Sequence, residues 1–347
     1  MTKVLYIGGY SRSGSTLLDR MLGQIPAHAS TGELGYITTH GLQENRLCGC
    51  GARFFDCPFW TRVGQEGFGG WDTPAANELI RLYPQVTRHR YIPLLLLPDV
   101  HPAFRRKLER YAELVGHLYH AVEVAGQAKV IIDSTIDPSR AFVLRHVPGI
   151  DLRILHLVRD SRGTAFSWTK LLTMKDSVDA VVPKGTIPPP LTAFRWMVYH
   201  LLFHGLSLLD KRQLLVRYED VVRAPREQLA RVAAYLDEEL DDEAVAFVKP
   251  TSLRLATDHT AVGNDMRFLQ GDVSLALDEE WRRALPARDR RIVTILTWPF
   301  LKRYRYVGRA SGMSCDPAQA RPRPTTSRLG AAFRPSRPAS GGRAGPR

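Results

Sequence analysis

The sequence predicts an α/β fold in which helices cover both faces of a parallel β-sheet. Short β-branched or aliphatic runs recur along the chain, and each precedes a segment with apolar residues at helical spacing. A glycine- and serine-rich turn joins the first such run to its helix. Of the 347 residues, 44% are hydrophobic, which is enough to bury a sizeable core. We therefore expect one domain over residues 1–308.

Four strand–helix units follow one another in the sequence. Residues 3–7 form a predicted strand that leads into the glycine-rich turn and then into a helix. Residues 129–132 precede a helical pattern that begins near Pro138, a residue suited to a first helical turn. Residues 152–158 and residues 213–217 are likewise followed by helical patterns. Alternation of strands and helices is typical of a parallel sheet.

Two regions depart from this alternation. Residues 43–115 are rich in glycine, proline and aromatic residues, and we interpret them as an inserted lid over the carboxyl edge of the sheet, where such sheets bind ligands. Residues 309–347 hold eight arginines, six prolines and one acidic residue, Asp316, and so carry +7 of the net charge of +13. This tail cannot offset its ordering entropy by burial, and we expect it to be disordered. A solvated terminus is the favoured interpretation, with RNA or a membrane surface as an alternative partner.

Composition excludes several classes of protein. No run of about 18 apolar residues exists, so we expect no transmembrane helix. The amino terminus lacks the pattern of a signal peptide. Four cysteines are too few for a disulfide scaffold of this size. A cytoplasmic protein is therefore expected.

A candidate phosphate-binding loop occupies residues 8–16, Gly-Gly-Tyr-Ser-Arg-Ser-Gly-Ser-Thr, between a predicted strand and helix. Glycines let several backbone N–H groups face one anion, and the start of a helix favours negative charge. Hydroxyl groups and the forked guanidinium of an arginine add further donors. The candidate ligands are Arg12, Ser13, Gly14, Ser15 and Thr16.

A small-molecule kinase is the first alternative. Gly9 and Gly14 have the spacing of a nucleotide-binding P-loop, but Ser15 stands where that motif requires lysine. Without the lysine, a triphosphate loses the charge that stabilises phosphoryl transfer. The loop therefore suits a single 5′-phosphate-type group better than a metal-bound triphosphate.

Four segments together resemble those of the sulfotransferases that use 3′-phosphoadenosine-5′-phosphosulfate (PAPS), of the bacterial type. Residues 10–16 resemble the family's 5′-phosphosulfate loop, and Arg159 with Ser167, eight residues later, resembles its 3′-phosphate clamp. Residues 217–220 resemble the segment near the adenine, and residues 263–268 resemble a late loop. The resemblance implies a P-loop-like fold and PAPS as co-substrate, with no metal. Besides the residues of the loop, the resemblance implies these further donor-binding residues: Arg159, Ser167, Tyr218, Asn264 and Arg267.

The resemblance also implies the reaction and its base. The sulfuryl group would pass to an acceptor hydroxyl of a small molecule, lipid or sugar, and nucleic acid is not an expected partner. Tyrosylprotein and many bacterial sulfotransferases use a glutamate preceded by glycine, a pattern that Glu33 matches. We therefore expect Glu33 and Arg12 to be catalytic, with His259 as a weaker candidate base and His28 and His40 less well placed.

Two positions depart from the family pattern. Ile136 stands where related bacterial sequences carry a lysine close to the transferred group, so Arg140 or another cation must replace that charge or the activity is altered. Leu17 stands where cytosolic members have a tryptophan that stacks on the adenine. The adenine must then pack on another side chain.

Three cysteines, Cys48, Cys50 and Cys57, form a C-x-C-x6-C cluster. With His40 they could bind zinc, because thiolates and imidazole are the ligands that this ion prefers. The spacing differs from the usual pair of C-x2-C motifs. Reduced structural thiols are the favoured interpretation, and a disulfide and a zinc site remain as alternatives.

Overall fold

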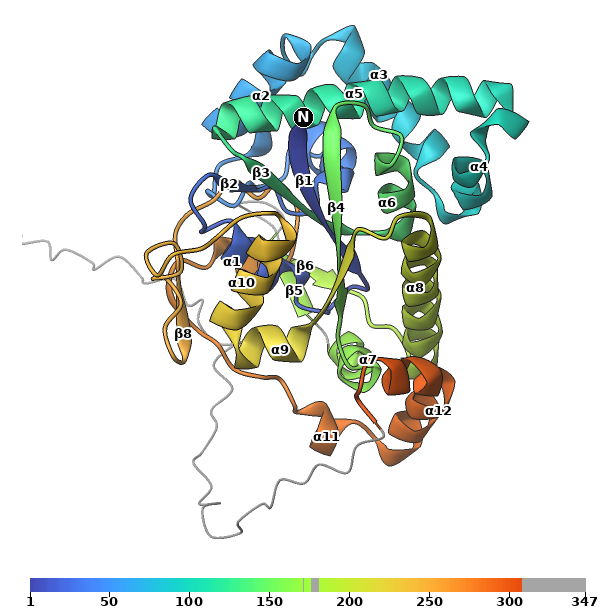
Figure 1. Cartoon of the computed structure of the whole chain (residues 1–347), viewed down its shortest axis with the longest axis vertical. Helices are drawn as coiled ribbons and strands as arrows, with labels where there is room; N and C mark the ends of the chain where they lie inside the picture. The colour runs from blue at the N-terminus through green and yellow to red at the C-terminus, as the bar shows by residue number, and fades with distance from the viewer. Residues whose placement is uncertain (171, 176–180, 308–347) are drawn as a thin grey trace, which may run out of the picture. The chain divides into compact units, whose positions relative to one another are not determined.

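The computed structural model describes residues 1–170, 172–175 and 181–307, and its compact unit extends from Met1 to Val307. Its centre is a five-stranded sheet in the order β2-β3-β1-β4-β7, in which every neighbouring pair is parallel (Figure 1). The predicted α/β fold with a parallel sheet is therefore confirmed. The predicted disordered tail, residues 309–347, lies outside the described residues.

The sheet strands include all four predicted runs and one that was not predicted, β2. Two antiparallel hairpins, β5–β6 and β8–β9, lie outside the sheet. The strands are β1 (Thr2–Gly9), β2 (His28–Ser30), β3 (Val130–Ile136), β4 (Ile150–Val158), β5 (Leu172–Lys175), β6 (Val181–Lys184), β7 (Gln213–Arg217), β8 (Ser252–Leu255) and β9 (Gly271–Ser274).

A helix directly follows each of the four predicted strands, as the alternation predicted. The long helical pattern after β7 is divided at Ala224, where the backbone leaves the helical region before Pro225. The helices are α1 (Ser15–Leu22), α2 (Pro58–Phe68), α3 (Pro74–Val86), α4 (Ile92–Leu96), α5 (Pro102–Gly126), α6 (Pro138–Leu144), α7 (Ser161–Thr169), α8 (Pro189–Leu209), α9 (Tyr218–Arg223), α10 (Pro225–Tyr235), α11 (Trp281–Ala284) and α12 (Ala287–Arg303). Shorter helical turns are η1 (Leu34–Tyr36), η2 (Ile37–Gln43), η3 (Phe54–Asp56), η4 (His89–Tyr91), η5 (Pro98–Val100) and η6 (Asp265–Phe268).

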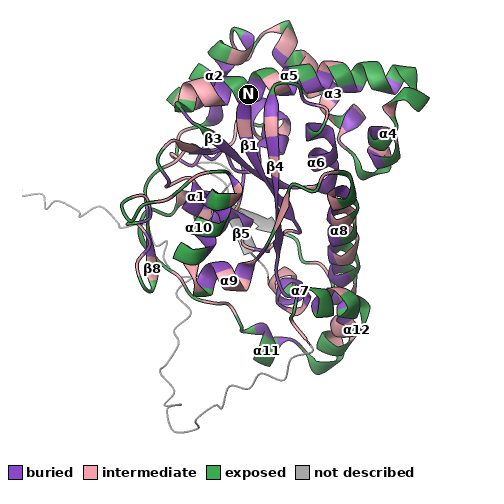
Figure 2. Cartoon of the chain, viewed as in Figure 1, coloured by how far each residue is buried: buried purple, intermediate pink, exposed green. Residues whose placement is uncertain are grey.

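Helices cover both faces of the sheet, and the strand sequences explain why. Side chains alternate along a strand, so consecutive apolar residues face opposite sides. In β1, Val4 and Tyr6 join a core with α5 and α6, whereas Leu5 and Ile7 join a second core with α1, α9 and α10. All four side chains are fully buried, and Figure 2 shows the central strands in the buried colour.

The inserted region packs mainly on α5. Helices α2 and α3 lie against α5, and in Figure 1 α5 crosses the end of the sheet at which β1 begins. There, Thr2 Oγ1 donates to Glu123 Oε2 at 2.5 Å. The segment after α3 extends to the other end of the sheet, because His89 pairs with Asp137, the residue after β3. This part of the insertion thus approaches the carboxyl edge.

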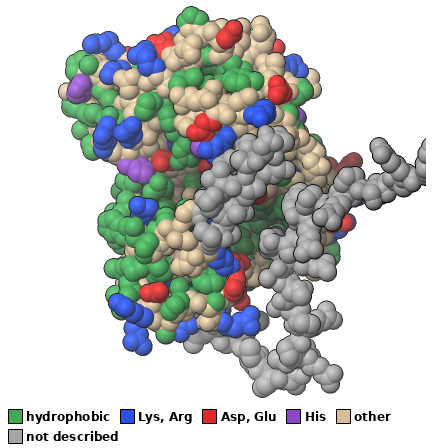
Figure 3. Space-filling model, turned by 180° about the vertical axis from the view of Figure 1, so that it is seen from behind, with side chains coloured by type: hydrophobic (Ala, Val, Ile, Leu, Met, Phe, Trp, Pro, Cys, Tyr) green, Lys and Arg blue, Asp and Glu red, His purple; other side chains and the backbone are tan. Residues whose placement is uncertain are grey.

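Helices α8 and α12 present apolar side chains to solvent. Seen from behind, hydrophobic side chains gather on the side of the molecule that these two helices form (Figure 3). Leu201 and Leu208 of α8 and Ile295 and Trp298 of α12 are among the exposed ones. Within the described chain, no helix combines the length and the continuous apolar character that crossing a membrane requires.

Candidate functional site

The predicted phosphate loop joins β1 to α1 at the carboxyl edge of the sheet. Ser15 and Thr16 are the first two residues of α1, so their backbone N–H groups lie at the start of the helix. Gly14 precedes them in a left-handed conformation (φ +84°), and its carbonyl accepts the hydrogen bond of Leu18 N at 3.1 Å. Arg12 is also left-handed (φ +71°). The loop therefore turns sharply enough to face several N–H groups toward one point.

Gly14 is required at this position for two reasons. Its left-handed backbone costs about 1–2 kcal/mol for any residue with a Cβ, and a Cβ would lie 2.4 Å from Cδ2 of Tyr218. We expect Gly14→Ala to reduce the free energy of unfolding by more than this backbone cost, measured by chemical denaturation. Gly69→Ala is the matched control, because Gly69 has φ +70° but open space around it. Equal losses in both variants would contradict the steric role of Tyr218.

Two arginines converge on the loop. Arg159, directly after β4, donates from Nη1 to the carbonyl oxygen of Arg12 at 2.9 Å and lies 4.6 Å from the centre of the Tyr218 ring. Burial and then the charge of Arg159 lower the pKa of Arg12. The structure therefore brings together Arg12, Arg159 and Tyr218, three of the predicted donor-binding residues.

Two buried donor atoms of the loop, Arg12 Nε and Ser13 Oγ, have no hydrogen-bond partner within the described part of the chain. The Arg12 guanidinium packs 4.9 Å from the centre of the Trp168 ring, on α7. Trp168 was not predicted, because its contact with the loop depends on the packing of α7. Buried donors without partners are costly, so these two atoms favour a bound acceptor such as water or an anion.

An acidic side chain that the sequence did not reveal borders the second clamp. Asp278 Oδ2 accepts from Arg159 Nη2 at 3.1 Å and lies 4.0 Å from Lys170 Nζ. Ser167, the other predicted member of the clamp, is half-buried on α7. Among the described residues, Asp278 is the carboxylate that pairs with Arg159.

Glu33 lies after β2, next to a segment from the far end of the chain. Its backbone N–H donates to the carbonyl of Val262 at 2.9 Å. Gly32 is left-handed (φ +70°), and a Cβ there would lie 2.2 Å from the same carbonyl oxygen. This contact explains physically why a glycine precedes the glutamate.

Polar and aromatic groups lie near Glu33, beginning with Tyr36. Burial and then the charges of Asp137 and Glu33 raise the pKa of Tyr36. His89 Nε2 pairs with Asp137 at 3.2 Å, and its ring contacts Tyr199 edge-on with the centres 5.1 Å apart. These contacts place Tyr36, Asp137, His89 and Tyr199 in one cluster near the carboxyl ends of β2 and β3.

Hydrogen bonds of buried and capping side chains hold the late loop, residues 263–268, in place. Asn264 caps η6, because its Oδ1 accepts from Met266 N at 3.3 Å. Arg267 is buried, and its guanidinium donates to the carbonyls of Gly263 (2.7 Å) and Leu47 (3.2 Å). These hydrogen bonds join Asn264 and Arg267, which were predicted to bind the sulfuryl donor, to other residues of the protein.

Arg20 of α1 is a structural residue of this loop that the sequence did not indicate. It is completely buried, and Nη1 donates to the carbonyls of Met266 (2.8 Å), Arg267 (3.0 Å) and Leu269 (2.8 Å). Its Nε lies 2.6 Å from Asp258 Oδ2. Arg20 thus ties the late loop to the helix that begins at the phosphate loop.

The other candidate histidines are engaged elsewhere. His28 contacts Glu238 at 2.8 Å, and His40 contacts Glu44 at 2.7 Å. His259 Nδ1 lies 3.2 Å from Cys57 Sγ.

The two departures from the family pattern are both buried. Ile136 is left-handed (φ +60°), a rare conformation for a β-branched residue. Arg140 donates to the hydroxyl of Tyr111 at 2.9 Å inside the core, and Leu17 belongs to the core around α1.

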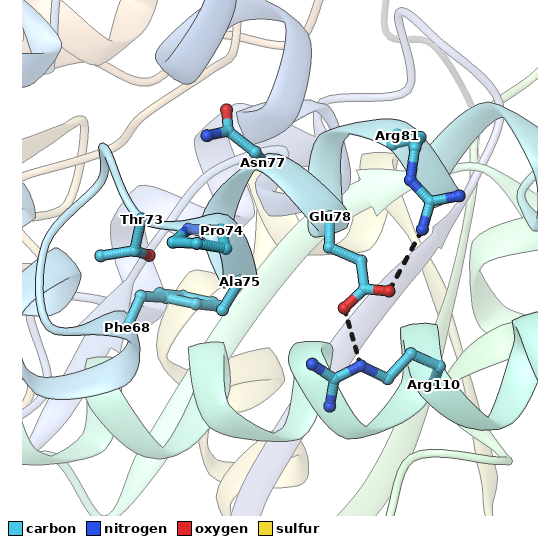
Figure 4. A pocket seen from close by; sticks show the side chains of 8 residues that line it. All are labelled: Phe68, Thr73, Pro74, Ala75, Asn77, Glu78, Arg81 and Arg110. Atoms are coloured by element: carbon cyan, nitrogen blue, oxygen red, sulfur yellow. Dashed lines mark hydrogen bonds and ion pairs between the residues drawn. The ribbon is translucent and has the colours of Figure 1, made fainter.

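A surface hollow of about 770 Å³ lies on the inserted region, bordered by α2, α3 and α5 (Figure 4). Glu78 lies at its centre and accepts from Arg81 at 3.1 Å and from Arg110 at 2.8 Å. Its charged side chains are thus paired with one another. None of its lining residues belongs to the phosphate loop or to the surroundings of Glu33.

Comparisons with known proteins found similarities in sequence and in structure. A sequence profile described as the sulfotransferase family matches residues 5–242, a stretch that includes Arg12, Glu33 and Arg159. Among solved structures, the sulfotransferase domain of the Synechococcus PCC 7002 olefin synthase is 22% identical, with 86% of this chain and 94% of that chain covered and a TM-score of 0.49. Sulfotransferase STF9 from Mycobacterium avium is 11% identical, with 87% and 76% covered and a TM-score of 0.45. Among curated proteins, no sequence matches at a significant level. The profile match covers well over half of the chain, and the chain therefore belongs to the sulfotransferase family.

Proposed function

We propose that this protein transfers a sulfuryl group from PAPS to the hydroxyl group of an acceptor, which yields 3′-phosphoadenosine-5′-phosphate (PAP) and a sulfate ester. The observation that carries the proposal is the convergence of Arg12 and Arg159 on the β1–α1 loop. Arg12 Nε and Ser13 Oγ are buried there without a partner among the described residues. Cations and unpaired donors at one place favour an anionic ligand.

The arrangement fits a donor with two anionic ends. The loop residues Ser13, Gly14, Ser15 and Thr16 would hold the 5′-phosphosulfate at the start of α1. Arg159 and Ser167 would hold the 3′-phosphate, the group that distinguishes PAPS from ATP. Tyr218, which packs on both Gly14 and Arg159, would border the nucleotide. Asn264 and Arg267 would act by positioning the late loop.

Two residues would carry the chemistry. PAPS supplies an activated sulfuryl group when bound. Glu33 would take the proton of the attacking hydroxyl as its oxygen bonds to sulfur. Arg12 and the loop amides would stabilise the negative charge that develops on the 5′-phosphate as the sulfur–oxygen bond breaks. This division of roles requires no metal ion.

The acceptor would lie among the groups around Glu33. The charges of Glu33 and Asp137 help to raise the pKa of Tyr36. The Tyr199 ring contacts the rings of Tyr10 and His89 edge-on, with the ring centres 5.1 Å apart in each pair. Aromatic faces with a few polar groups are typical of small-molecule sites. We therefore propose a hydroxylated small molecule, lipid or sugar, to be identified by mass spectrometry after transfer from labelled PAPS into a cell extract. A labelled protein band in place of a small product would contradict this acceptor class.

Ligand-induced thermal stabilisation tests the proposed donor. PAP without magnesium should raise the melting temperature, because a ligand at 100 times its Kd adds about 2.7 kcal/mol to the stability of the folded state. Mg-ATP should add much less, since it lacks a 3′-phosphate. Stabilisation by Mg-ATP alone would favour the kinase alternative. Deletion of residues 309–347 should leave PAP binding unchanged, and a loss would instead favour a role of the tail in anion binding.

A further inference from the structure

Three cysteines and one histidine meet at a point where two distant parts of the chain touch. Cys48, Cys50 and Cys57 come from the inserted region, and His259 lies 202 residues after Cys57 in the sequence. Their three sulfur atoms and one ring nitrogen all lie within 4.8 Å of one another. Only the tertiary fold brings His259 next to the three cysteines, because they are distant in the sequence.

Four of the six distances between these atoms are close to those of a tetrahedral set of ligands. Cys57 Sγ lies 3.5 Å from Cys48 Sγ and 3.7 Å from Cys50 Sγ. His259 Nδ1 lies 3.2 Å from Cys57 Sγ and 3.9 Å from Cys48 Sγ. Zinc bonds of about 2.3 Å to sulfur and about 2.0–2.1 Å to nitrogen place tetrahedral ligand atoms about 3.6–3.8 Å apart. The sulfur atoms are also too far apart for a disulfide bond, which is about 2.05 Å long.

Local structure holds each cysteine in place. Gly51 N donates to the carbonyl of Cys48 at 2.8 Å, which closes a tight turn around Cys50, and Cys48 N donates to the carbonyl of Ala52. Cys57 directly precedes α2. The start of a helix stabilises the thiolate form, which is the form that binds metal.

Packing also orients the histidine. The His259 ring stacks on Phe59, with the centres 5.1 Å apart and the planes 9° from parallel. Its backbone carbonyl accepts from Trp60 Nε1 at 2.8 Å. Nδ1 is thereby directed at the sulfur atoms.

We propose that Cys48, Cys50, Cys57 and His259 together bind one structural zinc ion. Three thiolates and one imidazole complete a tetrahedral shell, so no position is left for substrate, as is typical of structural rather than catalytic sites. The proposal adopts the zinc site that the sequence left as an alternative, and it takes His259 in place of His40 as the fourth ligand.

The ion would join the inserted region to the segment that holds Glu33. Gly49 N donates to the carbonyl of Thr260, the residue after His259, at 2.9 Å. Two residues further, the carbonyl of Val262 accepts from Glu33 N. The metal would thus help position Glu33 without contact with the reacting atoms, and the zinc proposal itself does not depend on the proposed function.

Metal analysis of the full-length protein tests the proposal. We expect one zinc per chain by mass spectrometry after purification without added metal. Cobalt in its place should give the intense visible bands of tetrahedral thiolate coordination. Cys57→Ser and His259→Ala should lose most of the bound metal. His259→Cys should retain it, because four thiolates also form a tetrahedral zinc site.

Two matched controls separate these ligands from other cysteines and histidines. Cys315→Ser removes the fourth cysteine of the chain, and His40→Ala removes the histidine expected from the sequence. Both should keep one zinc per chain. If Cys57→Ser fails to fold, release of zinc from the wild-type protein by a thiol-binding mercurial serves instead. Metal-free wild-type protein with four titratable thiols, or equal zinc loss in His40→Ala and His259→Ala, would overturn the proposal.

Discussion

Glu33→Gln is expected to lower turnover by about 10²–10⁴-fold, because glutamine keeps the shape of glutamate but cannot take the proton of the attacking hydroxyl. Affinity for PAPS should stay within a few-fold, since the proposed donor ligands lie in the β1–α1 loop and at Arg159. The fold should persist, because glutamine keeps the shape of glutamate and the bond from the backbone N–H of residue 33 to Val262 is unchanged. Steady-state rates together with calorimetric PAP binding would measure both effects.

The pH profile distinguishes a base from a structural carboxylate. Wild-type activity should rise with pH as the base loses its proton, and this limb should be absent in Glu33→Gln. Glu44→Gln is the matched control, because Glu44 is an exposed carboxylate paired with His40 and Arg46. Near-normal turnover in Glu33→Gln, or a loss of PAP binding as large as the loss of rate, would refute the assignment.

Arg159→Ala is expected to weaken binding of PAP and PAPS by about 10–150-fold, which corresponds to about 1.5–3 kcal/mol for a charge-assisted contact. Adenosine 5′-phosphosulfate lacks the 3′-phosphate and should lose much less. Arg159 also bonds to the carbonyl of Arg12, so the adenosine 5′-phosphosulfate result isolates the effect of a loosened loop. Equal losses for both ligands would mean that Arg159 only supports the loop.

Three further variants make this test more specific. Arg153 lies in β4, the strand that Arg159 follows, and pairs with Asp151 and Asp237. Arg153→Ala should therefore leave PAP binding unchanged. Asp278→Asn should shift affinity in the opposite direction, because the carboxylate 3.1 Å from Arg159 repels an incoming phosphate. Removal of the half-exposed Asp278 charge should change the binding free energy of PAP by about 0.5–1 kcal/mol, which corresponds to a few-fold tighter binding. Glu280→Gln, which alters the nearby partner of Lys170, is its control.

The central architecture could be predicted because it depends on local patterns. The apolar run of β1 buries alternate residues on both faces, and only a parallel sheet covered on two sides accommodates such a run. The loop after β1 could be recognised because its glycine permits a left-handed turn that other residues resist. Glu33 was singled out by resemblance to a family pattern in which glycine precedes glutamate, and the structure gives the reason for that glycine in the close approach of Val262.

Features without a local pattern escaped prediction. Strand β2 has three residues, too few to show an alternation, and its place beside β3 is set by pairing with Val130–Ile132. The break between α9 and α10 depends on one residue before a proline, within a continuous helical pattern.

Contacts between distant segments were decided by the tertiary structure alone. Asp278 pairs with Arg159 across 119 residues, and His259 meets Cys57 across 202. Sequence spacing favoured His40 for the cysteine cluster, but His40 pairs with Glu44 one turn away. Periodicity and turn chemistry act over a few residues, whereas the partner of a buried ion or thiol depends on which segments the packed core brings together. That information lies in the three-dimensional arrangement of the strands and loops and in no single stretch of the chain.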